Sequence, residues 1–189
     1  MFQLRNSLNL SACAVATAVL LAACGGGDGA KVSKIDGGFS VDGGIAQKGP
    51  LAAGSNVSID ELISSTFASA GASYNLQTTG DQGSFDASAL RFTRQYIKTF
   101  VSGYYRNEIT GEKANDQVTL MAYSDLDSDR LVNVNLLTTL AGPRIEKLVR
   151  DNTSKSTYRN FGAARDQAEK EVLAAFRVYN SADLLKGGA

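Results

Sequence analysis

Three aspartates in an alternating run are the side chains best placed to do chemistry. Asp125, Asp127 and Asp129 lie in the segment Asp125-Leu126-Asp127-Ser128-Asp129, and Asn133 falls at the ninth position counted from Asp125. Oxygen ligands at alternate positions of a loop can converge on one calcium ion, and the ninth position often contributes through a water. The run is therefore a candidate calcium loop.

Two residues distinguish this run from the EF-hand loop whose start it resembles. Arg130 stands where a glycine would make the sharp turn, and Leu136 stands where a bidentate acid would complete the calcium shell. The residues before the run also have a strand pattern instead of a helical one. The alternative is a solvated acidic turn in which Asn133 or Asn135 caps the following helix, and the sequence favours this alternative.

The amino-terminal segment has the pattern of an export signal. Arg5 supplies a positive charge, and an apolar run over residues 8–21, broken by Asn9 and Ser11, follows it. A transmembrane helix needs roughly 20 apolar residues to cross a hydrocarbon core of about 30 Å, so this run is too short and too interrupted to span. We expect residues 1–23 to be a signal peptide that is removed.

The apolar run ends in Leu21-Ala22-Ala23-Cys24. This segment resembles the lipobox of bacterial lipoproteins, which implies that the sulfur of Cys24 is diacylated and that Cys24 becomes the first residue of the mature protein. Each buried methylene adds about 0.8 kcal/mol of membrane affinity, so two or three acyl chains hold a protein essentially permanently. Gly25 resembles the outer-membrane address of the better-known sorting systems. The alternative is an ordinary secretory signal cleaved after Ala22 or Ala23.

The residue types of the chain argue against an enzyme. There is no His, and of the two cysteines Cys13 lies in the signal while Cys24 would carry the lipid. Catalysis by His or Cys, zinc sites and disulfides are thereby excluded from the mature protein. Ser154-Lys155-Ser156 is better interpreted as a polar turn than as a nucleophile and its base. Asp60 and Glu61 could form a carboxylate pair, yet neighbours in a strand face opposite ways.

The paired aromatic residues Tyr104 and Tyr105 end the longest predicted strand. Two adjacent aromatics can form a binding platform. More often, one such residue packs in the core while its neighbour lies at the rim with its hydroxyl in water, and we favour this second interpretation.

Residues 43–124 have the pattern of a β-domain. Short alternating segments are separated by glycines and polar turns, which is typical of an antiparallel sheet with one buried face. The segments with this alternation are residues 56–62, 74–78, 84–85, 91–105 and 117–123.

After Asn135 the apolar period becomes helical. Residues 136–149 predict one helix, with Pro143 either kinking it or starting a second piece, and residues 161–176 predict another. Residues 151–156 supply a polar turn with possible N-caps. Because neither helix could bury its apolar stripe alone, we expect a hairpin packed on the sheet or beside it.

The predicted organisation is therefore an α+β chain, in which an antiparallel β-sandwich is followed by a carboxy-terminal helical hairpin. The predicted segments are a signal peptide at 1–23, a Gly-rich tether at 24–42, a β-sandwich at 43–124, a helical hairpin at 125–179 and a tail at 180–189.

Two family resemblances follow from these segments. Residues 47–57, 79–85 and 102–105 resemble the spacing of prealbumin-like sandwiches of the carboxypeptidase-regulatory type, with an early Gly-Pro turn, a Gly-x-Phe hairpin and a late Gly-Tyr. Residues 103–111, 133–138 and 174–176 resemble a group of uncharacterised bacterial lipoproteins. Many members of that group continue into larger surface proteins, and the resemblance implies a fold but no reaction.

We expect a lipid-anchored, non-enzymatic protein of the cell envelope, most simply of the outer membrane, that acts as a structural or interaction module. Its partner would be an envelope protein or a glycan. A nucleic-acid partner is excluded because Lys plus Arg and Asp plus Glu both number 19, which leaves no basic excess. The alternatives are a calcium-stabilised accessory module of a larger surface protein, and a hydrolase.

Overall fold

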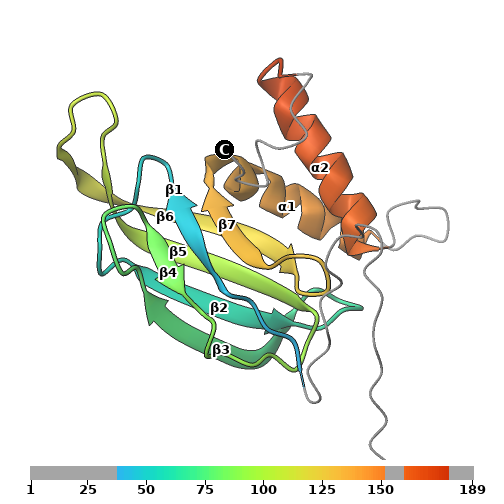
Figure 1. Ribbon diagram of the computed structural model, residues 1–189. Coiled ribbons are helices and arrows are strands. Elements are labelled where there is room, and N and C mark those ends of the chain that lie inside the picture. Colours follow the sequence, from blue (N-terminus) through green and yellow to red (C-terminus); the bar gives the residue numbers. More distant parts are fainter. Residues whose placement is uncertain (1–37, 152–159, 179–189) are drawn as a thin grey trace, which may run out of the picture. The chain divides into compact units, whose positions relative to one another are not determined.

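A computed structural model describes residues 38–151 and 160–178, which form seven strands followed by two helices (Figure 1). The strands are β1 (Gly43–Gln47), β2 (Asn56–Leu62), β3 (Ser69–Gln77), β4 (Ser84–Asp86), β5 (Tyr96–Arg106), β6 (Lys113–Asp125) and β7 (Leu131–Asn135). The helices are α1 (Leu136–Arg150) and α2 (Phe161–Ala175).

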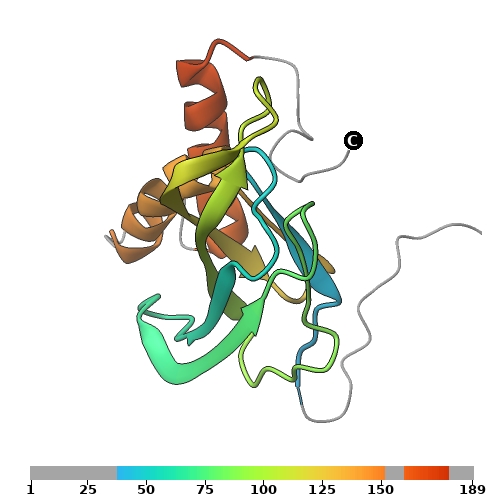
Figure 2. The same cartoon turned by 90° about the vertical axis from the view of Figure 1, so that its left-hand side faces the viewer.

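The strands form two sheets, which Figure 2 shows as separate layers. One sheet has four strands in the order β3-β2-β5-β6, and all of its pairs are antiparallel. The other has three strands in the order β4-β1-β7. The predicted α+β class, with two sheets mostly of antiparallel strands and helices that follow the strands, is confirmed.

The pair formed by β1 and β7 is parallel, with Gly43 opposite Leu131 and Gln47 opposite Asn135. The expectation of an entirely antiparallel sandwich is therefore wrong at this pair. The strand β7 itself was not predicted, because its segment was assigned to an acidic turn and the start of the helical part. Five residues beside such a turn carry little local signal, and it is the distant partner β1 that makes them a strand.

The main core lies between the two sheets. Along β2, Val57 and Ile59 are buried on one face, as the alternation over residues 56–62 predicts. Val132 and Val134 of β7 reach the same cluster from the opposite sheet. Burial of aliphatic side chains on facing sheets is what holds such layers together, at about 25 cal/mol for each Å² removed from water.

A second core lies on the other face of β6. Leu120 and Ala122 point into the main core, whereas Met121 and Tyr123 pack in a cluster with the helices. Residues of both helices join this second cluster, among them Ala141, Ile145, Phe161, Ala164 and Ala168. The predicted packing of two helices against the sheet is therefore seen in the part of the chain that the structure describes.

Helix α1 begins at a capping box. Asn135 is the N-cap, and its side-chain oxygen accepts a hydrogen bond from the Thr138 N–H at 2.9 Å while the Thr138 hydroxyl accepts one from the Asn135 N–H. Pro143 lies inside a single continuous helix, so it starts no second piece.

Helix α2 is capped by Asn160, whose side-chain oxygen accepts from the Ala163 N–H at 2.7 Å. The expected cap in residues 151–156 is therefore wrong, and most of that segment lies outside the described residues. Arg144 of α1 ties the helices together through two hydrogen bonds to Glu171 of α2, at 2.7 and 2.9 Å. Hydrogen bonds from Arg144 and Gln167 lower the pKa of Glu171.

Two predicted boundaries differ from the structure. Phe39 forms a bridge with Phe92, and Val41 is only 1% exposed, so residues 38–42 belong to the packed domain instead of the tether. The strand expected at 91–105 begins at Tyr96, because Thr93 bends away to bond Glu61. The signal peptide and the tail lie outside the described residues.

Candidate functional site

The acidic run forms a turn that bonds to itself. Oδ1 of Asp125 accepts from the Asp127 N–H at 3.0 Å and from the Gln95 amide at 2.9 Å. Oδ2 of Asp129 accepts from the Asp125 N–H at 2.9 Å and from the Arg165 guanidinium at 2.6 Å. The carboxylates are therefore engaged with donors of the protein, as a capped turn requires.

Asn133 lies in β7, where it pairs with Ile45. Across residues 38–151 and 160–178, no group of three or more acidic, His or Cys side chains is arranged to hold a metal ion. The structure thus does not gather the three carboxylates of Asp125, Asp127 and Asp129 as the predicted calcium loop requires. Asn135 caps the helix, which agrees with the alternative interpretation of a turn and a cap.

Arg165 is the residue that sequence reasoning missed at this turn. It is mostly buried, and it also lies 4.0 Å from Glu169. Burial acts to lower the pKa of Arg165, but the nearby charges of Asp129 and Glu169 raise it overall, so the guanidinium stays charged. Its effect is to fasten α2 to the turn after β6.

Glu61 is a buried carboxylate that accepts hydrogen bonds from Tyr74 and Thr93 and so joins their segments. It is 1% exposed, and it accepts hydrogen bonds from the Tyr74 hydroxyl at 3.1 Å, the Thr93 N–H at 2.8 Å and the Thr93 hydroxyl at 2.6 Å. Asp60 is opposite Lys98 and Ser73 on the strand, so its side chain points to the other face. The two carboxylates therefore do not form a catalytic pair.

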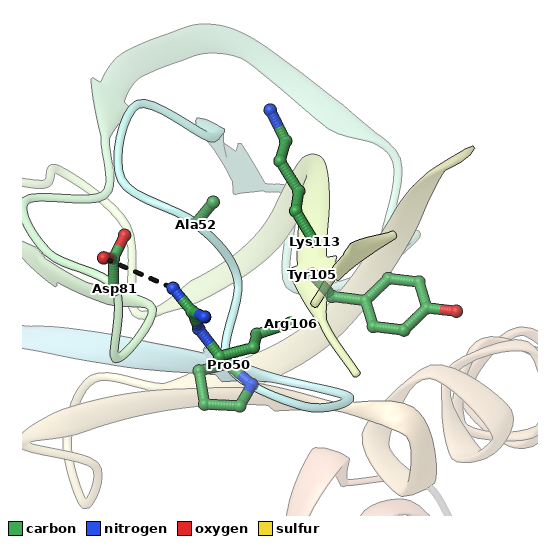
Figure 3. Close-up of a pocket in the computed structure, with 6 residues that line it drawn as sticks. All are labelled: Pro50, Ala52, Asp81, Tyr105, Arg106 and Lys113. Carbon is green, nitrogen blue, oxygen red and sulfur yellow. Dashed lines mark ion pairs between the residues drawn. The ribbon is translucent and has the colours of Figure 1, made fainter. Parts of the chain in front are cut away.

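Polar, charged and aromatic side chains gather at the turn end of the β5–β6 hairpin. Strand β2 pairs with β5 only as far as Ser102, whereas β5 and β6 continue as a pair to Arg106 and Lys113. A cleft of about 240 Å³ lies beside this extension (Figure 3). Its lining residues are Pro50, Ala52, Asp81, Tyr105, Arg106 and Lys113.

A second hollow of about 320 Å³ adjoins the cleft, since Tyr105 and Lys113 line both. It follows the turn of the hairpin, along Asn107, Thr110 and Glu112. At that turn, the side chain of Ile109 is 95% exposed. The hairpin end therefore presents a continuous irregular surface with an apolar tip.

Two lysines at this surface lie on tyrosine rings. The Lys48 ammonium is 4.2 Å from the ring centre of Tyr105, and the Lys113 ammonium is 4.1 Å from that of Tyr104. A cation over an aromatic face gains roughly 0.5–1 kcal/mol at an exposed site. These contacts orient both lysines while their charges stay accessible to water.

Arg106 is, with Lys113, one of the two cationic residues that line the cleft. Its guanidinium donates to the Gly111 carbonyl at 2.6 Å, and it lies 3.7 Å from the carboxylate of Asp81. Figure 3 shows the Tyr105 ring and the Lys113 ammonium pointing away from this ion pair. Since the polar groups do not converge on one point, the geometry suits an extended macromolecular surface better than a small molecule.

Tyr105 fits the favoured interpretation of a residue that packs at the core, and whether it also forms a binding platform stays a prediction. It packs against the main core and forms a bridge with Leu51, and it also lines the cleft. The basic residues Lys48, Arg106 and Lys113 and the acid Asp81 were not predicted as members of a site. Arg106 and Lys113 flank the predicted Thr110-Gly111 turn, which was the one local signal available for them.

The lipobox residues Leu21, Ala22 and Ala23 and the expected lipidation site Cys24 lie outside the described residues. Within the described chain, neither helix has the length and apolarity needed to cross a membrane. Comparison with family models, with curated proteins and with solved structures finds no match to this chain.

Proposed function

We propose that this chain is a lipid-anchored, non-enzymatic protein of the cell envelope, most simply of the outer membrane, and that its folded domain binds another envelope protein. The signal pattern followed by Leu21-Ala22-Ala23-Cys24 supports the anchor. The end of the β5–β6 hairpin, where Ile109 is exposed and lysines lie on the rings of Tyr104 and Tyr105, is the single observation that carries the binding role.

The composition of this hairpin end supports a protein partner. Interfaces between proteins are enriched in Tyr and Arg, and an exposed apolar side chain beside them can fill a partner's pocket. The charges are mixed, because Asp81, Glu112 and Asp116 lie among the cations of the two hollows. Mixed charge fits a protein surface better than a uniformly anionic glycan.

The finer fold assignment is part of this proposal. Two facing sheets, an early turn at Gly49-Pro50 and the Gly83-Ser84-Phe85 segment that enters β4 support a prealbumin-like sandwich of the carboxypeptidase-regulatory type. In this view the chain is a lipoprotein of the group with a lipobox, such a sandwich and a helical segment.

The anchor is tested on the full-length chain in a bacterial host. Mass spectrometry of the parent protein is expected to find acyl chains on residue 24, and the protein is expected to fractionate with membranes. The Cys24→Ser variant should lose both properties. An unmodified thiol at residue 24 of the parent would overturn the anchor.

The binding role is tested with a photo-crosslinking residue placed at position 109 of the full-length chain. A discrete protein adduct is expected there, and it should disappear when Lys113→Glu is added. The matched control carries the same crosslinker at Ser88, an exposed position outside both hollows. No adduct at position 109, equal adducts at both positions, or an adduct with a glycan instead would contradict the proposal.

A further inference from the structure

The edge of the four-stranded sheet formed by β3 is open to another strand. β3 is the terminal strand in the order β3-β2-β5-β6, and Ser73, Asn75 and Gln77 are exposed. Unpaired backbone groups along a sheet edge are a ready template for pairing with another chain, and natural proteins usually block them. A sheet edge that lacks such blocking features is therefore a candidate site for pairing with another chain.

The opposite edge of the same sheet is blocked at Met121. On β6, the Met121 N–H donates to the Thr139 hydroxyl at 2.9 Å, and the Met121 carbonyl accepts from the Thr138 hydroxyl at 2.9 Å. Helix α1 thus bonds directly to the backbone of this edge strand. In the other sheet, the edge strand β4 has only three residues.

Strand β3 lacks the usual blocking residues. Its sequence, SAGASYNLQ, contains no charged residue and no proline. The only irregularity is in its first half, where Gly71 has a φ of +89° and the register with β2 shifts between Asp60 and Leu62. Residues 73–77 are left as a regular segment, because each of them pairs with β2 without a shift.

The ladder with β2 determines which backbone groups of this segment point outward. The Thr78 N–H donates to the Ser55 carbonyl at 3.0 Å, so Thr78 faces β2. Hydrogen-bonded and non-hydrogen-bonded positions alternate along an antiparallel pair. The N–H and C=O groups of Ser73, Asn75 and Gln77 therefore point away from β2, and no other element of the described chain bonds to them.

The segment is complementary to itself. In an antiparallel arrangement with a two-fold axis at Asn75, Ser73 of one copy lies opposite Gln77 of the other, and Tyr74 lies opposite Leu76. Polar pairs then share the exposed face, while aromatic–aliphatic pairs continue the half-buried face. No like charges meet, and closed two-fold symmetry is the commonest symmetry of homo-oligomers.

We propose that two copies of this chain pair through residues 73–77 of β3, antiparallel and with Asn75 opposite Asn75 of the partner. The sheet would then run continuously through both copies, with β6 and its covering helix at each outer end. This inference does not depend on the lipid anchor, because it rests only on the edge of the sheet.

Single cysteines in the detergent-solubilised full-length protein test the register. In the hydrogen-bonded pair at position 75 the two Cα atoms would be about 5.5 Å apart, a distance that a disulfide can bridge. Asn75→Cys is expected to give a disulfide-linked dimer on mild oxidation. Ser73→Cys is the matched control, since it would lie four residues along the strand from its own copy, roughly 14 Å away.

The parent chain, oxidised in the same way, shows how much disulfide-linked dimer its own cysteines form. A free thiol at Cys24, left by a failed lipidation, is thereby distinguished from a failure of the β3 strands to pair. Linkage by Ser73→Cys as strong as by Asn75→Cys, or no linkage by either, would overturn the proposal. Linkage of Asn75→Cys to a different protein would show that the edge has another occupant, and it would overturn the proposal equally.

A charge at the edge provides a second measurement. Sedimentation of the parent in detergent is expected to give the mass of two chains, and Asn75→Lys should shift it to one chain because two lysines would lie directly opposite each other. Gln117→Lys, at an exposed position of β6, should leave the dimer intact. Circular dichroism checks that both variants fold. A parent protein of single-chain mass would contradict the pairing.

Discussion

At the scale of single residues, the side chain of Thr99 lowers the stability of the folded protein. It is completely buried in β5, and its hydroxyl has no hydrogen-bond partner among the described residues. Thr99→Val is therefore expected to raise the free energy of unfolding by about 1 kcal/mol, because a methyl group needs no partner. Denaturant unfolding at neutral pH measures this change.

Thr78 provides the matched comparison, because its buried hydroxyl accepts from the Ser55 N–H at 3.0 Å and donates to the Ala52 carbonyl at 2.7 Å. Thr78→Val should lower the free energy of unfolding by about 1–3 kcal/mol. A loss of stability of similar size in both variants would show that the Thr99 hydroxyl has a partner.

The buried hydroxyl of Tyr123 contributes to the response of the protein to alkali. Burial, and then the charge of Glu146 that accepts its hydroxyl at 3.2 Å, raise the pKa of Tyr123. The folded state therefore holds this proton more tightly than the unfolded state, whose tyrosines titrate near 10. The stabilisation is complete below pH ~10 and is lost as the pH rises above that value.

Tyr123→Phe is expected to lose less stability than the parent between about pH 9 and about pH 11, because phenylalanine has no proton to release. Denaturant midpoints measured across this pH range give the dependence of stability on pH for the parent and for the variant. Equal slopes for parent and variant would mean that other groups control the alkaline transition.

At the scale of elements, Asn135 links β7 to α1. As the N-cap of α1 it satisfies backbone N–H groups that the helix itself cannot bond. Asn135→Ala is expected to lower the free energy of unfolding by about 1 kcal/mol, and Asn135→Asp, which can still accept the bond, should recover most of it. Thermal melts of the three proteins test this, and a poor recovery with Asp would indicate that the side chain acts elsewhere.

The turn between β6 and β7 is held by α2 through Arg165. Removal of this cation leaves the half-buried carboxylate of Asp129 without its cationic partner, so Arg165→Met should lower the free energy of unfolding by about 1–3 kcal/mol. The double variant Arg165→Met with Asp129→Asn should recover part of this loss. Additive losses would show that the two residues do not interact.

The same contact predicts the response of this turn to calcium. With Asp125 and Asp129 bonded to protein donors, millimolar calcium is expected to leave the melting temperature of the parent unchanged. A calcium-dependent rise that Asp127→Ala abolishes would instead support the calcium-stabilised alternative.

At the scale of the whole molecule, we expect the proposed anchor and the folded domain to act independently. The two described cores draw on residues from Val41 to Ala168, far along the chain from Cys24. Cys24→Ser is therefore expected to change where the protein fractionates but to leave its melting temperature within about 1 °C of the parent, because substitutions that leave the described cores intact usually alter stability little. A large fall in melting temperature would show that the amino terminus contributes to the fold.

Local features account for the parts that were predicted correctly. The alternation of Val57 and Ile59 and the three- and four-residue steps of Phe161, Ala164 and Ala168 reflect one buried face of a strand and of a helix. The cap at Asn135 is equally local, because donor and acceptor lie in one turn. Such contacts depend on near neighbours only.

Contacts between distant segments account for the parts that were missed. Strand β7 exists because β1 lies beside it, and the edge of β6 is blocked because α1 folds back onto Met121. Arg165 and Asp129 are 36 residues apart, so the local sequence around either residue does not predict their ion pair. The cleft likewise forms only where the turn that contains Asp81 lies beside the end of the β5–β6 hairpin that contains Arg106.

The sequence by itself thus determined the α+β class, the positions of most strands and both helices, an amino-terminal pattern typical of an export signal, and the absence of His. Periodicity and residue type are properties of short segments, and these suffice for such conclusions. Only the tertiary structure decided the strand order, the parallel pair, the edge left open at β3 and the residues that share the hairpin cleft. Those features depend on which distant segments meet, and no local pattern encodes that choice.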